Sequence, residues 1–114
     1  MEIAYNVEPA LVDIVIRQRD TFQMSFDILL NDLDYSFGSA EVKMRVIKQD
    51  GTLVRELMSI GESPAITLDG KNITFNSTGF DEPGEFPYDV QVTKNEATLT
   101  FMAGTVRVHR DVTP

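Results

Sequence analysis

Residues 84–93 read Gly84-Glu85-Phe86-Pro87-Tyr88-Asp89-Val90-Gln91-Val92-Thr93, and apolar and polar side chains alternate along this run. Because successive side chains of a β-strand point to opposite faces, the alternation predicts a strand with one buried face and one wet face. The polar residues Lys94-Asn95-Glu96 follow, and a second alternating run extends from 97 to 108. Together the two runs predict a long β-hairpin, which organises the rest of the domain.

The second run changes its parity partway along. Leu99 and Phe101 place apolar side chains at odd positions, whereas Val106 and Val108 place them at even positions. A strand changes face only where an extra residue or a tight bend interrupts it. Gly104 lies between the two patterns, so we predict a bulge or bend at Gly104.

Shorter alternating runs precede this hairpin. Asp50-Gly51 and Asp69-Gly70 each separate two of them, and Asp-Gly is a strong signal for a tight hairpin turn. No segment has sustained helical periodicity, and the strand at 10–18 is followed by turn signals at intervals of about 8–12 residues. The sequence therefore predicts an all-β fold, an antiparallel immunoglobulin-like β-sandwich of about seven or eight strands.

The composition fits one folded domain. The chain has 114 residues, of which 42% are hydrophobic and 25% charged, and we interpret residues 1–9 as an N-terminal arm and 10–114 as a single sandwich domain. With no cysteine, disulfides and thiolate metal sites are excluded. The 18 acidic and 10 basic residues give a net charge of −8, which disfavours nucleic-acid binding. The start of the chain predicts neither a signal peptide nor a membrane span.

Catalysis has little support in the residue pattern. The single histidine, His109, lies in the last predicted strand between Arg107 and Arg110. A nucleophilic mechanism needs a base that a third group orients beside the nucleophile, so we interpret His109 as a solvent-facing strand residue. Glycine patterns that hold phosphates are absent, and we expect no cofactor and no enzymatic activity.

The densest pair of carboxylates is Asp32 and Asp34, within a predicted loop. Hard cations bind oxygen ligands at short spacing, which makes this pair a candidate for calcium. The run lacks the Asp-x-Asp-x-Asp-Gly pattern of a calcium loop, and loop carboxylates commonly form turn hydrogen bonds instead. We therefore predict no metal site and keep calcium at Asp32 and Asp34 as the alternative.

The aromatic residues allow two interpretations, a stacking platform for bases or sugars, or a hydrophobic core. Their positions on the buried parity of predicted strands favour the core. The residues concerned are Phe22, Phe26, Phe75, Phe86, Tyr88 and Phe101.

Several motifs occur in a defined order along the chain. A strand Val12-Asp13-Ile14-Val15-Ile16-Arg17-Gln18 precedes a polar turn and the aromatic-led strand Thr21-Phe22-Gln23-Met24-Ser25-Phe26. Later come Gly84-Glu85-Phe86-Pro87-Tyr88-Asp89-Val90, then Gly104-Thr105-Val106-Arg107-Val108, then Asp111-Val112-Thr113. In this order they resemble a family of bacteriophage virion proteins, the amino-terminal domain of the baseplate upper protein and its tail relatives. The resemblance spans about the whole chain.

The resemblance implies a structural adaptor without catalysis. A protein of this kind would be made in the bacterial host cytoplasm and would reside in the virion, at the tail, neck, baseplate or capsid surface. Its partners would be other virion proteins, in a symmetric homo-oligomer, with neither nucleic acid nor membrane. The alternative is a β-sandwich that binds a host receptor or carbohydrate.

Two residues depart from the pattern of this family. Phe86 stands where relatives often have tyrosine, so a hydroxyl tie to the backbone is not expected at that position. Pro87 removes a donor from the ladder, which predicts a sheet edge or a strand start there.

The arm supplies the candidates for partner binding. Ile3, Tyr5 and Val7 alternate with other residues, so the arm is able to add a strand to an exposed sheet edge of a neighbour. The alternative is that the arm folds back along its own sandwich.

Overall fold

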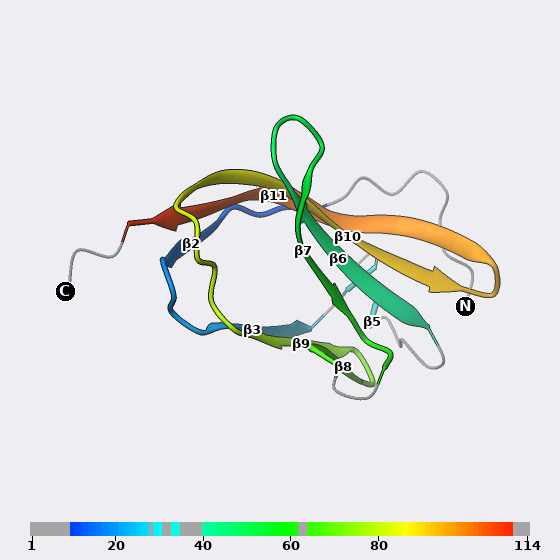
Figure 1. The fold of residues 1–114 in the computed structure, drawn as a ribbon. Coiled ribbons are helices and arrows are strands. Elements are labelled where there is room, and N and C mark those ends of the chain that lie inside the picture. The colour runs from blue at the N-terminus through cyan, green and yellow to red at the C-terminus, as the bar shows by residue number, and fades with distance from the viewer. Residues whose placement is uncertain (1–9, 28, 31–32, 35–39, 62–63, 111–114) are drawn as a thin grey trace.

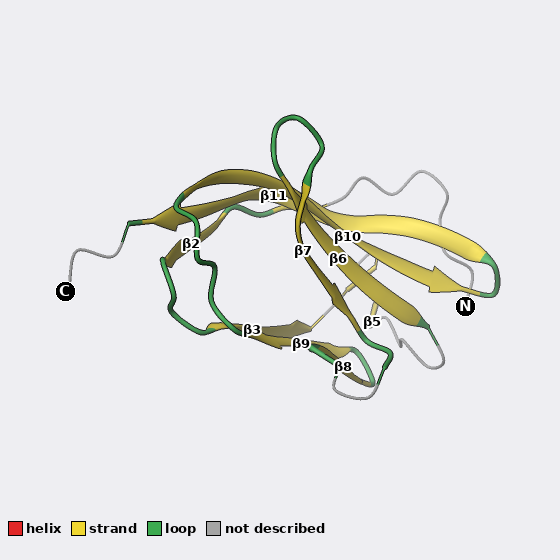
Figure 2. Cartoon of the chain, in the orientation of Figure 1, coloured by secondary structure: helices red, strands yellow, loops and turns green. Residues whose placement is uncertain are grey.

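A computed structural model describes residues 10–27, 29–30, 33–34, 40–61 and 64–110. All regular structure in these segments is β (Figures 1 and 2). They contain no helix capable of crossing a membrane. The strands are β1 (Ala10–Leu11), β2 (Ile14–Arg17), β3 (Phe22–Asp27), β4 (Leu29–Leu30), β5 (Leu33–Asp34), β6 (Glu41–Ile47), β7 (Leu53–Met58), β8 (Ile66–Asp69), β9 (Asn72–Ser77), β10 (Gly84–Lys94) and β11 (Ala97–His109).

The strands form two principal sheets that face each other (Figure 1). The larger sheet has the order β1-β11-β10-β6-β7, with β2 also paired to β11. The smaller sheet has the order β3-β9-β8, and β4 and β5 form a separate two-residue pairing. The predicted all-β, immunoglobulin-like sandwich is confirmed. More strands are present than the predicted seven or eight because β1 and β2 divide one predicted strand and β4 and β5 were not foreseen.

The core lies between the two principal sheets. In β6 the side chains of Val42, Met44 and Val46 are buried, whereas those of Lys43 and Arg45 are exposed, as the period of two requires. The buried side chains of both sheets form one cluster that comprises Phe22, Ala40, Val42, Met44, Val46, Leu57, Ile66, Ile73, Phe75, Phe80, Phe86, Tyr88, Val90, Val92, Met102, Val106 and Val108. The core interpretation of the aromatic residues is confirmed for Phe22, Phe75, Phe86 and Tyr88, and the side chain of Phe26 lies outside the described residues.

The long hairpin of β10 and β11 is confirmed, and its turn is tight. Lys94 lies opposite Ala97, which leaves Asn95 and Glu96 as the two turn residues, with φ of 53° and 68°. Positive φ at both central positions is typical of the type I′ turn, whose twist matches that of the flanking strands.

The predicted turn at Asp50-Gly51 is also confirmed. Gly51 has φ of 92° and its N–H donates to the Lys48 carbonyl oxygen at 2.9 Å. The Thr52 N–H donates to the Asp50 carboxylate at 2.9 Å and holds the pKa of that carboxyl below its usual range.

The predicted position of the bulge at Gly104 is wrong. The register between β10 and β11 shifts where Val90 lies opposite Met102 and Gln91 lies opposite Thr100, so Phe101 is the extra residue. Gly104 has a different role. A Cβ on Gly104 would lie 2.2 Å from the Val12 carbonyl oxygen, so the glycine allows β1 and the residues after it to approach β11.

The antiparallel prediction is wrong at one edge of the larger sheet. β1 and β2 both pair with β11 in the parallel direction. Ala10 lies opposite Met102 and Ile14 lies opposite Val106, so the register is the same on both sides of the interruption. At the interruption the Thr105 N–H donates to the Asp13 carboxylate at 3.3 Å.

The prediction of a strand start at Pro87 is wrong, because β10 begins at Gly84. The other prediction, a sheet edge, is confirmed for this part of the strand, because Gly84 to Pro87 pair with β11 alone. The ladder between β10 and β6 begins at Tyr88, which lies opposite Val46, so Pro87 interrupts no hydrogen bond to β6.

Candidate interaction surface

A surface hollow of about 590 Å³ lies at the end of the sandwich where β2 and β11 both finish. Because these strands are parallel, Arg17 at the end of β2 lies opposite His109 at the end of β11. The hollow is lined by Val15, Ile16, Arg17, Asp20, Thr21, His109 and Arg110.

The turn from β2 to β3 is held against the rest of the domain by hydrogen bonds from Gln18 and Arg19. The Gln18 N–H donates to the His109 carbonyl oxygen at 2.7 Å, and the Arg19 N–H donates to the Phe80 carbonyl oxygen at 2.8 Å. The Gln18 side-chain amide donates to the Asp81 carbonyl oxygen at 2.6 Å. The backbone that carries Arg17 and Arg19 is therefore fixed.

The basic side chains at this end differ in how they are paired. Arg107 lies 3.2 Å from the Glu85 carboxylate and 3.6 Å from that of Asp13. Within the described part of the chain, Arg17, Arg19 and Arg110 form no ion pair, and all three are exposed. The lining of the hollow has two arginines, Arg17 and Arg110, against one carboxylate, Asp20, so it is basic on balance although the chain has a net charge of −8. A basic hollow favours an acidic group as its ligand.

Arg19 has φ of 67°, in the left-handed region. Glycine and asparagine adopt this conformation with less strain than a long side chain does. Arginine at this position costs backbone energy, and its side chain supplies a charge at the end of the sandwich that carries the hollow.

A second, smaller hollow of about 160 Å³ lies on the outer face of the larger sheet. It is lined by Arg45, Ile47, Pro87, Tyr88 and Asp89. The Oδ1 atom of Asp89 is buried there and has no hydrogen-bond partner among the described residues. Arg45 lies beside it across the ladder and is 3.4 Å from the Glu56 carboxylate. An acceptor and a donor therefore meet at this hollow.

The interpretation of His109 as a solvent-facing strand residue is confirmed, since it is exposed at the end of β11. The calcium alternative is not resolved by the fold. Asp32 lies outside the described residues, and Asp34, in β5, is described in its backbone alone. Elsewhere in the described chain no three His, Cys, Asp or Glu side chains are grouped as a metal would need. The arm candidates Ile3, Tyr5 and Val7 also lie outside the described residues.

Sequence reasoning did not find the hollow. The signal was present as Arg17 and Arg19 near one end of the chain and Arg110 near the other. Only the parallel pairing of β2 with β11 brings them together, and an antiparallel arrangement places strand ends differently.

No protein-family model matches the sequence, and no curated protein is found to be similar. Among solved structures, the extracellular domains 3–5 of Drosophila OTK match with a TM-score of 0.42 and 16% identity. The match covers 96% of this chain and 37% of that chain. Similarity at this level assigns no function.

Proposed function

We propose that this chain is a non-enzymatic structural component of a tailed-phage virion, made in the cytoplasm of the bacterial host and built into the tail, neck, baseplate or capsid surface. It acts as an adaptor or decoration protein, in a symmetric homo-oligomer that contacts other virion proteins. The arm residues Ile3, Tyr5 and Val7 are its proposed contacts with a neighbour.

One observation carries the proposal: three of the five motifs that resemble the phage family lie in neighbouring strands of the larger sheet, whereas the motif at 21–26 lies in β3 of the smaller sheet. The motif at residues 12–18 includes β2, the motif at 84–90 begins β10, and the motif at 104–108 lies in β11. These strands are neighbours in the larger sheet, in the order β2-β11-β10. Motifs that are far apart in sequence but adjacent in the fold support a common structural origin better than scattered matches do.

The surface of the described residues also fits a role in assembly. Leu11 is 83% exposed and Val15 is 61% exposed, and both lie on the edge formed by β1 and β2. A sheet edge with apolar side chains and free backbone groups is a site for strand addition.

The test is mass spectrometry of virions purified from the bacterial culture that produces the protein, followed by electron microscopy of the particles. The expected result is that the protein co-purifies in stoichiometric amount at a symmetric position. A form without residues 2–8 should fold but should not enter the particles. Absence of the protein from purified virions would refute the proposal.

The alternative, a module that binds a host carbohydrate, has one observation in its favour. Asp89 and Arg45 both line the smaller hollow, so an acceptor and a donor for a hydroxylated ligand lie in one lining, and the Oδ1 atom of Asp89 has no hydrogen-bond partner among the described residues. Saturation-transfer NMR with host surface glycans tests it, with Asp89→Asn as the binding variant. Binding that the substitution removes supports this function, and no transfer from any host glycan excludes it.

A further inference from the structure

We propose that the chain self-assembles head to tail, with the β10–β11 turn of one copy seated in the basic hollow of the next. The contact joins Glu96 of the turn to Arg17 and Arg110, which line the hollow, and to Arg19 in the turn that follows β2. This inference rests on the proposed function, which requires that copies of the chain assemble, and it names the two surfaces that make the contact.

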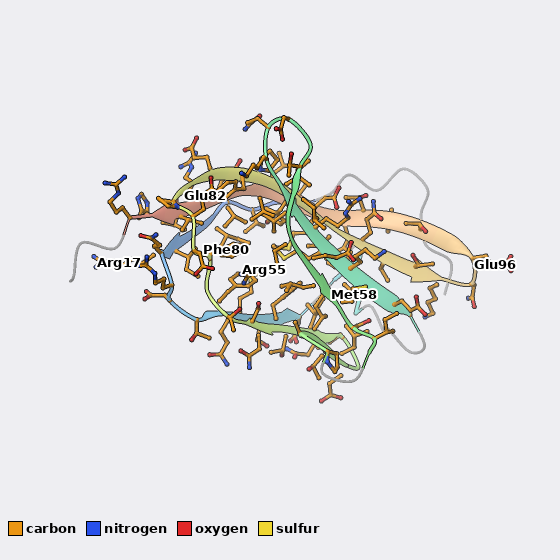
Figure 3. All side chains as sticks on the ribbon, in the orientation of Figure 1. Arg17, Arg55, Met58, Phe80, Glu82 and Glu96 are labelled. Carbon is orange, nitrogen blue, oxygen red and sulfur yellow. The ribbon has the colours of Figure 1, made fainter. Side chains whose placement is uncertain are left out.

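The two surfaces lie at opposite ends of the molecule. The domain is elongated, with extents of 49 × 28 × 24 Å. Figure 3 places Arg17 at one end of the long axis and Glu96 at the other. A contact between different surfaces of identical copies is heterologous, and repeating it produces a ring or a filament.

The charges are complementary. Arg17, Arg19 and Arg110 form no ion pair in the described chain, and Glu96 forms none either. Lys94, the nearest cation to Glu96 along the chain, already has an interaction within its own copy. The turn therefore offers a carboxylate without an ion pair to a surface on which three such arginines outnumber the Asp20 carboxylate.

The shapes agree with this pairing. Asn95 and Glu96 are exposed at the tip of the longest hairpin. Figure 3 shows Glu96 at this end of the domain. The hollow at the other end has a volume of about 590 Å³ and apolar side chains, Val15 and Ile16, in its lining. A narrow turn with one carboxylate is an occupant that fits such a hollow.

The turn residue itself is the strongest observation. Glu96 has φ of 68°, at the position where Asn-Gly turns carry glycine. Arg19 has φ of 67°, at a position where glycine is likewise less strained. The chain thus keeps two charged residues of opposite sign in strained conformations, one at each end. A contact between these ends accounts for both.

The decisive variant is Glu96→Gly, which relieves the strain and removes the charge. It should raise the melting temperature of the domain while weakening self-association at least about ten-fold, as loss of a charge pair at an interface does. Self-association is measured by sedimentation velocity over a concentration series at low salt. Because the variant is more stable, a loss of association is not attributable to misfolding.

A mixing experiment tests the pairing of the two surfaces. Arg17→Glu and Glu96→Arg should each prevent self-association, because each variant alone brings like charges together. Mixed in equal amounts they should assemble, since every contact between unlike copies then has opposite charges. Glu96→Gln and Gln49→Lys change the net charge of the chain by the same amount, +1. Only Glu96→Gln should weaken self-association, because Gln49 is exposed between β6 and β7 and belongs to neither of the two contact surfaces.

Three results would overturn the inference: association of Glu96→Gly equal to that of the unmodified chain, no rescue in the mixture, or a chain that stays monomeric at millimolar concentration in low salt. These outcomes are independent of the proposed function. A protein found in virions whose charge-reversed variants are incorporated normally would refute the head-to-tail contact alone. A protein that assembles as described but is absent from virions would refute the phage role alone.

Discussion

Tyr88 connects the middle of the larger sheet to its parallel edge. Its hydroxyl donates to the Val12 carbonyl oxygen at 2.5 Å, at the point where the chain passes from β1 to β2. The sequence had predicted no hydroxyl tie at Phe86, and the tie is instead made two residues later. Burial, and secondarily the Asp13 carboxylate, raise the pKa of Tyr88 to about 12.

Replacement of Tyr88 by Phe should lower the free energy of unfolding by about 1 kcal/mol at pH 7, the net value of one hydrogen bond. It should also change the response to alkali. In the unfolded chain a tyrosine ionises near pH 10, whereas folded Tyr88 keeps its proton to about pH 12. The unfolded state therefore loses a proton that the folded state retains, and stability falls as the pH rises from about 10 to 12.

Urea unfolding at pH 8 and at pH 11 measures this effect. The unmodified chain should lose more stability over that interval than Tyr88→Phe does, since the variant lacks the phenol. All other ionisable groups are the same in both proteins, so their contributions cancel in the comparison. Identical losses in the two proteins would mean that Tyr88 titrates normally.

Gly104 is required by contact with backbone. A Cβ at this position would lie 2.2 Å from the Val12 carbonyl oxygen and 2.8 Å from its carbon, and neither atom belongs to a flexible side chain. Gly104→Ala should therefore destabilise the domain by about 3 kcal/mol, at the upper end of the range for overpacking. Thr98→Ala, on the exposed face of the same strand, should cost about 0.5 kcal/mol. Thermal unfolding of both variants checks this, and equal costs would contradict the close approach.

At the scale of elements, hydrogen bonds from Arg55 connect β7 to the segment between β9 and β10. Its guanidinium donates to the Ser77 hydroxyl at 3.2 Å, to the Thr78 carbonyl oxygen, and to the Gly79 carbonyl oxygen at 2.9 Å. It also lies over the ring of Phe80, 4.6 Å from the centroid, and Figure 3 shows both side chains between the sheets. Phe80 in turn contacts Phe22 edge-on, with ring centroids 5.9 Å apart.

Arg55→Lys should cost about 2 kcal/mol, because lysine keeps the charge but lacks the planar fork that contacts several acceptors at once. Arg45→Lys is the matched control on the neighbouring strand β6, where the ion pair with Glu56 is exposed to solvent and should contribute about 0.5 kcal/mol. Chemical denaturation gives both values. If Arg55→Lys were as stable as the unmodified chain, the positive charge alone would account for the contribution of Arg55, and the planar fork would not be needed.

The elements that the sequence predicted well are those whose information is local. The turns at Asp50-Gly51 and at residues 95–96 follow from residues adjacent in the chain, and alternation predicted the buried faces of β6 and β10. The buried position of Phe80 was missed because it lies between strands, where no period applies. The bulge was misplaced because a glycine in a strand marks either a bulge or the close approach of another backbone. Only the position of the Val12 backbone beside Gly104 shows that the second applies here.

At the scale of the whole molecule, the fold class was predictable and the candidate surface was not. Strand count and turn spacing predict a sandwich, since any set of half-buried strands must cover its apolar faces. The hollow depends on a pairing between β2 and β11, which lie near opposite ends of the chain. Period-two patterns say which face of a strand is buried but do not say which strand is its neighbour or in which direction it runs.

The parallel pairing of β1 and β2 with β11 also has a mechanical consequence. The chain enters this pairing at Ala10 and leaves it at His109, and the two strands run in the same direction. Tension between the two ends therefore acts along the strands and loads the hydrogen bonds between them in shear, so they resist together instead of opening one at a time. A domain pulled at its ends should therefore extend only when the hydrogen bonds of β1 and β2 with β11 break together. Gly104→Ala disturbs the approach of Val12 to β11, so the unfolding force of this variant in single-molecule extension should be lower.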